Sequence, residues 1–187
     1  MKKSLLAASA LVSVALLVSL AEAAPTYVPI ALPQGAVTVL PFGINDSNII
    51  AGGYTDSAGV LHGFFGPPDG SNLTSFDAPG AVGVTTAEGI NDAGLVSGLY
   101  TDSSGNRHAF EFNVSTGKFK AIDPGDGSSA QEAWGINQKG LIVLDTNSGA
   151  APYIYCPLKP RRCPKGAAAA EVNPAHVLAL KRPIAIP

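Results

Sequence analysis

Short stretches in which apolar and polar residues alternate, each followed by a turn rich in Gly, Asp, Asn and Ser, make up most of this sequence. In residues 107–113 (RHAFEFN), Phe110 and Phe112 fall on one face of an extended chain, as in a half-buried strand. Residues 95–101 (LVSGLYT) and 118–123 (KFKAID) flank this segment beyond the turns DSSG and VSTG. The pattern predicts an all-β, turn-rich fold.

The same pattern recurs with a fixed period. GINDSNIIAGGYTDSAGVLHGF begins at Gly43, GINDAGLVSGLYTDSSGNRHAF at Gly89 and GINQKGLIVLDTNSG at Gly135, so successive starts are 46 residues apart. Residues 43–88 and 89–134 are identical at 14 of these 46 positions. Four short strands in such a period match one blade of a β-propeller. We therefore expect tandem four-stranded, β-propeller-like blades, about three in number.

The sequence before the first repeat is similar to the end of a repeat. Residues 30–33 (IALP) lie one period before residues 76–79 (FDAP). We therefore expect an N-terminal strand over residues 27–33 that forms the outer strand of a sheet. The β-propeller-like repeat domain is then expected to span residues 24–156.

About three blades fall short of the roughly four to eight that close a propeller. Three arrangements fit this number. In the first, two chains related by a two-fold axis form a six-bladed ring as a homodimer. In the second, the chain is an open, partial propeller that is capped by the tail of residues 157–187. In the third, the chain is a shortened relative of a longer repeat protein. The apolar runs in the tail favour the capped, open array.

The first residues have the features of a secretory signal peptide. Lys2 and Lys3 precede a long apolar run, and Ala-Glu-Ala at positions 21–23 matches a small-x-small cleavage site. We expect residues 1–23 to be cleaved and the protein to be secreted or periplasmic. An uncleaved membrane anchor is the alternative.

Cysteine usage agrees with export. Cys156 and Cys163 are the two cysteines, separated by six residues. In an oxidising compartment such a pair forms a disulfide, here closing a small loop at the start of the tail. A metal pair is the alternative, but no second Cys or His pair lies close enough in sequence to complete a zinc site.

Composition and charge narrow the classes of partner. Apolar residues make up 46% of the chain, charged residues 14%, and the formal net charge is −2. This balance excludes a charge-driven disordered segment, a coiled coil and a basic nucleic-acid-binding domain. After signal cleavage no second apolar run reaches membrane-spanning length. We therefore expect neither nucleic acid nor a membrane as a partner.

Histidines and several other residues recur at fixed positions of the repeat. His62 and His108 are equivalent, and each shares a strand face with a phenylalanine. Ile154 stands one period after His108, so we interpret this position as structural, with a metal or ligand site built from two repeats as the alternative. The other recurring positions that we interpret as structural are Gly43, Asn45, Tyr54, Phe64, Gly89, Asn91, Tyr100, Phe110, Gly135 and Asn137.

Carboxylates in the turns form a candidate ligand rim. Asp56 and Asp102 precede turn glycines, where an aspartate accepts hydrogen bonds from nearby backbone N–H groups. Asp126 belongs to the most acidic loop, residues 123–129. Calcium is the alternative ligand for these oxygens, and we expect no other metal and no cofactor. No combination of residues predicts a catalytic site.

The repeat pattern GINDxGxxxGxYTDxxGxxHAF resembles the bacterial HAF-type extracellular repeat family, named for the triplet found here at residues 108–110. The resemblance covers residues 43–134 well and residues 135–156 weakly. It implies an exported, β-propeller-like protein for which the family has no general reaction.

These observations favour a binding or scaffold module that presents its turns to an extracellular protein or glycan. Two alternatives stay open. One is a hydrolase or lyase that acts on extracellular polysaccharide or peptidoglycan through Asp56 and Asp102, which requires two carboxylates within roughly 5–10 Å in a cleft. The other is a structural matrix protein.

Overall fold

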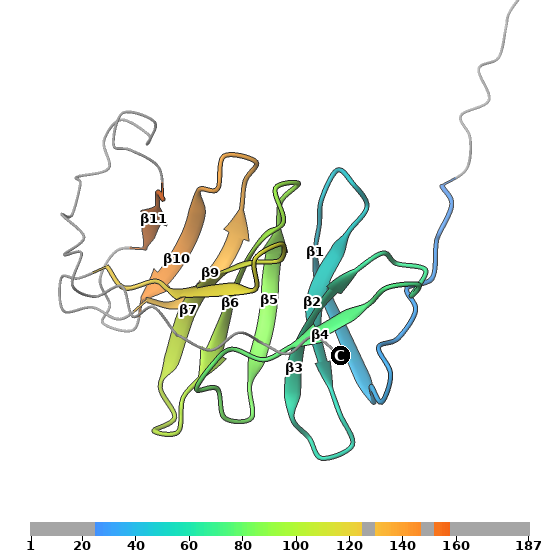
Figure 1. The fold of residues 1–187 in the computed structure, drawn as a ribbon, viewed down its shortest axis with the longest axis horizontal. Helices are drawn as coiled ribbons and strands as arrows, with labels where there is room; N and C mark the ends of the chain where they lie inside the picture. Colours follow the sequence, from blue (N-terminus) through green and yellow to red (C-terminus); the bar gives the residue numbers. More distant parts are fainter. Residues whose placement is uncertain (1–24, 125–129, 147–151, 158–187) are drawn as a thin grey trace, which may run out of the picture.

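The computed structural model describes residues 25–124, 130–146 and 152–157, and in these ranges the chain is all-β, without a helix (Figure 1). A helix able to cross a membrane is therefore also missing from this part of the chain. The predicted signal peptide, Asp126, Cys163 and nearly all of the 157–187 tail lie outside the described residues. The disulfide of Cys156 with Cys163 accordingly stays a prediction.

The strands form three antiparallel sheets whose neighbours follow chain order. The first sheet contains β1 (Thr38–Ile44), β2 (Ile50–Thr55), β3 (Leu61–Gly66) and β4 (Thr74–Phe76). The second contains β5 (Thr85–Ile90), β6 (Leu95–Thr101), β7 (Arg107–Asn113) and β8 (Lys118–Ala121). The third contains β9 (Ala130–Ile136), β10 (Ile142–Thr146) and β11 (Tyr153–Tyr155). The prediction of an all-β fold is confirmed.

Each copy of the 46-residue repeat contributes one sheet. Gly43, Gly89 and Gly135 each occupy the next-to-last position of the first strand of their sheet. One residue earlier, at Phe42, Glu88 and Trp134, the pairing of that strand with the next skips a residue and forms a bulge. The register around the turn and the bulge is thus the same in all three first hairpins, and the third has a second shift further on, between Asp145 and Thr146.

Residues 27–33, predicted to be an N-terminal strand, are not a strand in the structure. The outer strand β4 pairs with β3, whereas residues 25–33 pair with no strand of the described ranges. They still run along the first sheet, where the Ala31 N–H donates to the Pro68 carbonyl (2.8 Å). Ile30 packs beside Phe64, much as Phe76, its counterpart one period later, packs beside Phe110.

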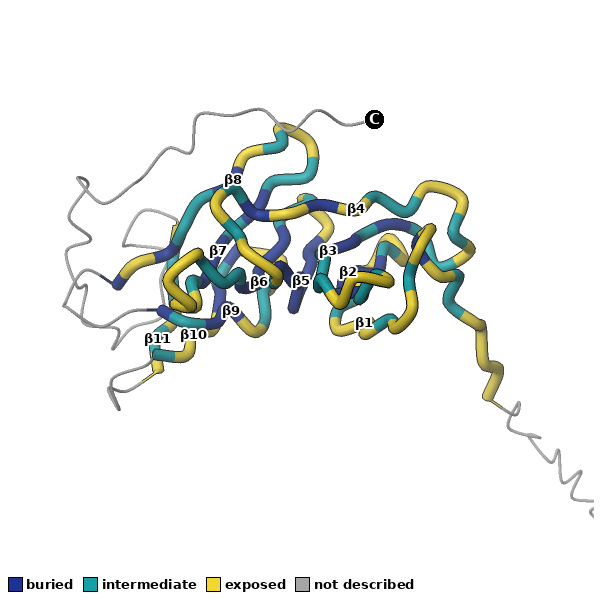
Figure 2. Tube along the Cα trace, turned by 90° about the horizontal axis from the view of Figure 1, so that it is seen from below, coloured by how far each residue is buried: buried dark blue, intermediate teal, exposed yellow. Residues whose placement is uncertain are grey.

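Apolar side chains fill the spaces between successive sheets. The residues coloured as buried in Figure 2 lie mainly in the strands. Between the first and second sheets, Phe76 stacks on Phe112 with ring centroids 4.9 Å apart, and Phe112 stacks on Phe119 at 4.4 Å. Between the second and third sheets a smaller cluster contains Ile122, Ile142 and other aliphatic residues. Such burial is the main favourable contribution to folding, so neighbouring repeats stabilise each other.

An asparagine in each first hairpin turn links one repeat to the next. The Asn45 Nδ2 donates to the Asn91 carbonyl (3.1 Å), and the Asn91 Nδ2 donates to the Asn137 carbonyl (3.0 Å). The side-chain oxygen of the same residue accepts from its own turn, at Ile49 N for Asn45 and at Leu95 N for Asn91. Each asparagine therefore fixes its own turn and positions its neighbour.

Glycine at the end of each first strand allows the sheets to approach closely. A Cβ atom added to Gly43 would lie 3.0 Å from the Gly89 Cα, and one added to Gly89 would lie 3.1 Å from the Ile136 nitrogen. Both distances are shorter than ordinary van der Waals contact, so a larger residue would push the repeats apart.

We expect Asn91→Ala to lower the free energy of unfolding by about 2–3 kcal/mol, because it removes two hydrogen bonds of a buried side chain, one to the Leu95 N–H of its own turn and one to the Asn137 carbonyl of the next repeat. Asn91 is only 1% exposed. Urea denaturation followed by circular dichroism measures the change. Ser115→Ala, which removes an exposed turn hydrogen bond, is the control and should cost about 0.5 kcal/mol or less. Equal losses in the two variants would contradict a linking role for Asn91.

Candidate functional site

The predicted rim residues form two aspartate–histidine pairs, one in each of the first two repeats. The His62 Nε2 lies 3.4 Å from the Asp56 Oδ2, and its Nδ1 lies 2.8 Å from the Asp77 Oδ1. In the second repeat the His108 Nε2 lies 2.8 Å from the Asp102 Oδ2. Each histidine also lies beside a tyrosine of the neighbouring strand, with ring centroids 5.2 and 5.0 Å apart.

Both turn aspartates stabilise the hairpin that carries them. The Asp56 Oδ1 accepts from the backbone N–H groups of Ala58 and Val60, each at 2.9 Å. Asp102 makes the equivalent pair of bonds in the second repeat. The hydrogen bond from Val60 lowers the pKa of Asp56, and the bond with His108 lowers the pKa of Asp102. Both side chains are therefore carboxylates at neutral pH.

The two carboxylates of His62 outweigh the effect of its burial. Burial favours the neutral ring, but Asp77 and Asp56 favour the charged ring, and the pKa of His62 is raised overall. A histidine held between two carboxylates in this way orients a turn and a strand. The arrangement resembles structural hydrogen bonding more than an activated nucleophile, which would need a Ser, Cys or Thr beside the ring.

The comparison of His108 with Ile154 was wrong, because the third sheet has a different register. Ile50 pairs with Gly66 in the first sheet, whereas its counterpart Ile142 pairs with Tyr155. The second hairpin of the third repeat is therefore three residues shorter. Ile154 pairs with Val143 and takes the place of Phe65, and the counterpart of the histidines falls at position 151, outside the described residues.

No hydrogen bond among the described residues joins Asp56 to Asp102, the two carboxylates considered for hydrolysis of a polysaccharide. Asp56 and Asp102 each bond to their own turn and to the histidine of their own repeat. Within the described ranges no group of three or more His, Cys, Asp or Glu residues could hold a metal ion. The observed bonds of the two aspartates thus stabilise the turns that carry them.

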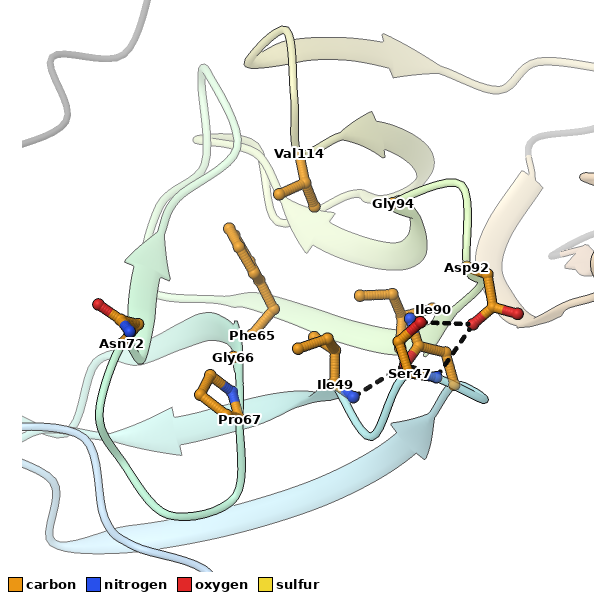
Figure 3. A pocket seen from close by; sticks show the side chains of 11 residues that line it. Ser47, Ile49, Phe65, Gly66, Pro67, Asn72, Ile90, Asp92, Gly94 and Val114 are labelled. Atoms are coloured by element: carbon orange, nitrogen blue, oxygen red, sulfur yellow. Dashed lines mark hydrogen bonds between the residues drawn. The ribbon is translucent and has the colours of Figure 1, made fainter.

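A groove between the first and second sheets, which sequence reasoning missed, has the shape of a binding site (Figure 3). Its volume is about 500 Å³. The apolar part of its lining comprises Ile49, Phe65, Pro67, Ile90 and Val114. The polar part comprises Asn45, Ser47, Asn72 and Asp92. Pockets of this size with apolar walls and a few polar groups are typical of ligand sites.

Turns from both repeats hold the groove open. The Ser47 N–H donates to the Asp92 Oδ1 (3.2 Å), which joins the first hairpin turns of the two sheets along one side (Figure 3). On the other side the Val114 N–H donates to the Gly94 carbonyl (2.9 Å). The first of these bonds connects the two sheets, and the second connects two turns of the second sheet.

The corresponding region between the second and third sheets is lined by different residues. Glu111 takes the place of Phe65 one period later. A Cβ atom on Gly140, the counterpart of Gly94, would lie 3.5 Å from both the Leu95 Cδ1 and the Pro157 Cγ. The sequence signal that could have located the groove is the loss of identity between the repeats after residue 64. Phe65, Gly66 and Pro67 are replaced by different residues one period later.

A second group missed from the sequence is a buried pair of glutamates. Glu88, in the bulge of β5, is 8% exposed, and Glu132 on β9 forms an ion pair with Arg107 (Nη2 to Oε2, 3.3 Å). Burial and the nearby charge of Glu132 raise the pKa of Glu88 to about 7, although Arg107 opposes the shift. The sequence signal that could have indicated this buried carboxyl is a single Glu within the otherwise uncharged strand TTAEGI.

Glu88→Gln tests whether this carboxyl destabilises the fold when it ionises. Because the folded-state pKa lies above the ordinary value, folding takes up a proton, and stability is lost as pH rises from about 4.5 to 7. The amide cannot ionise. We expect the variant to gain about 1–3 kcal/mol relative to the wild type between pH 5 and pH 8, measured by urea denaturation.

Asp69→Asn is the control for this pH effect. Hydrogen bonds from the Ser71 backbone and hydroxyl lower the pKa of the exposed Asp69 carboxyl, so its effect on stability should be the same at pH 5 and pH 8. A difference between wild type and Glu88→Gln that does not change with pH would show that Glu88 is not a buried, titrating group.

The described site thus consists of two structural aspartate–histidine pairs, one groove between sheets and one buried glutamate pair. Comparison of the chain with protein-family models, with curated proteins and with solved structures found no match.

Proposed function

We propose that the chain is an exported repeat protein that acts as a binding or scaffold module. The observation that carries this proposal is the groove of about 500 Å³ between the first two sheets. The apolar run after Lys2 and Lys3 and the cleavage pattern at residues 21–23 support export to a secreted or periplasmic location. The likeness of the repeat to the HAF-type family points to the same compartment.

In this proposal the three sheets are propeller-like blades. Two features support it. The first strand of each sheet packs against the sheet of the preceding repeat, β5 on β2 and β3, and β9 on β6 and β7. The first strands also lie next to one another, β1 beside β5 and β5 beside β9, as the inner strands of blades do around an axis.

The lining of the groove favours an apolar side chain of a partner protein over a sugar. Phe65, Ile90 and Val114 would contact such a side chain, and burying it would supply the affinity. The Asp92 carboxylate at the edge would suit a neighbouring N–H group or a lysine of the partner. A glycan would instead need aromatic faces and many hydrogen-bond partners around the whole site.

Nuclear magnetic resonance with the ¹⁵N-labelled protein, purified from the exported fraction, tests this function. We expect short peptides that contain Leu or Phe next to Lys to shift the backbone amides of Gly66 and Gly94 saturably. Neutral oligosaccharides should leave these amides unchanged. The opposite result, in which sugars bind and peptides do not, would overturn the assignment of a protein partner.

Filling the groove should abolish peptide binding. In Val114→Trp the indole ring would occupy the space between Phe65 and Ile90, and we expect the dissociation constant to rise at least about tenfold. Val82→Trp places the same ring at an exposed position away from the groove lining and should bind as the wild type does. Equal affinities for the two variants would show that peptides bind elsewhere.

A further inference from the structure

The outward face of the third sheet has the features with which the first two sheets hold their successors. Added Cβ atoms on Gly43 and Gly89 would meet the backbone of the following repeat, but one on Gly135 would meet no atom of the described residues within 4 Å. Val143 is 50% exposed, whereas its counterparts Ala51 and Ser97 are completely buried. The face resembles those that receive the following repeat in the first two sheets, but no further repeat packs on it among the described residues.

The hydrogen bonds between repeats end at the same face. Asn45 and Asn91 each donate their Nδ2 to the asparagine carbonyl of the next repeat. The Asn137 Oδ1 accepts from Lys139 and Leu141 of its own turn, as in the other repeats. Its Nδ2 makes no hydrogen bond within the described ranges, so the third repeat presents a donor to whatever lies beyond it.

The first sheet has the complementary face. Leu40 and Ile44 are 43% and 62% exposed, whereas Thr86 and Ile90, their counterparts one repeat later, are 4% and 7% exposed beneath the first sheet. Ile30 and Ala36 cover the part of this face around Phe64 and leave the β1 edge open.

Within the described ranges, the backbone carbonyl of the asparagine also has fewer hydrogen bonds in the first repeat than in the other two. The Asn91 and Asn137 carbonyls each accept an Nδ2 from the preceding repeat in addition to a backbone N–H of their own turn. The Asn45 carbonyl accepts only from the Asn48 N–H among the described residues. The first repeat thus offers the acceptor that matches the donor of the third.

We propose that a second copy of this chain occupies both faces, with the third sheet of each copy packed against the first sheet of its partner. The new contact repeats the interface already formed between successive sheets, down to the Gly–Gly approach and the asparagine hydrogen bond. A two-fold axis makes both contacts at once. The six sheets then fall within the roughly four to eight that a closed propeller needs. This assembly does not depend on what the groove binds.

Light scattering on the full exported chain tests the proposal, and we expect twice the mass of one chain. Gly135→Val should give single chains, with a dissociation constant at least about tenfold higher. The branched side chain has free space within one chain but would separate the two first strands at the new contact. Ile44→Asp should give single chains as well, because it places a charge on the opposite face.

Mixing the two variants distinguishes this head-to-tail contact from any other. In a pair of identical variant chains, both contacts contain one altered face. In a mixed pair, one contact joins the unaltered third sheet of the Ile44→Asp chain to the unaltered first sheet of the Gly135→Val chain. We therefore expect a mixed pair to form. The control Thr116→Val alters an exposed turn and should associate like the wild type, and thermal melts should show that all variants are folded.

Two results would overturn the proposal. One is a wild-type chain that stays single at high micromolar concentration, as it would if residues 158–187 or another protein covered the third sheet. The other is a wild-type pair that Gly135→Val leaves intact.

Discussion

The asparagine at the first turn of each repeat is the constraint on which the stacked arrangement depends. Its carbonyl and side-chain oxygen close its own turn, and in the first two repeats its Nδ2 bonds to the carbonyl of the next asparagine. Hydrophobic burial between sheets is strong but does not fix one register, because apolar contacts are not directional. The asparagine bonds supply that register, and the glycine two residues earlier in each repeat allows the strands to come close enough to form them.

The sequence was sufficient to predict the local structure where the repeat is faithful. Residues 107–113 form β7 and residues 95–101 form β6 with the expected bounds, since alternation and turn residues agree there. The strand expected over residues 27–33 fails for a non-local reason, because a strand needs a partner as well as a suitable sequence. The register of Ile154 fails because a deletion in a hairpin shifts the pairing without changing the strand pattern.

The site could be predicted only in part, for a related reason. The histidines and turn aspartates recur, and a periodic position is more often structural than functional, as the bonds of Asp56 and His62 illustrate. The groove and Glu88 depend on residues that differ between repeats. Their importance follows from which side chains meet across two sheets, and a single sequence does not contain that information.

The bulge before each repeat glycine has a consequence for how such a stack diversifies. Its residue is skipped by the pairing, so the backbone there does not depend on which side chain is present. The three repeats have Phe42, Glu88 and Trp134 at this position. The same bulge therefore carries a phenyl ring, a carboxylic acid and an indole. The bulge therefore accepts three chemically different side chains without a change in the pairing around it.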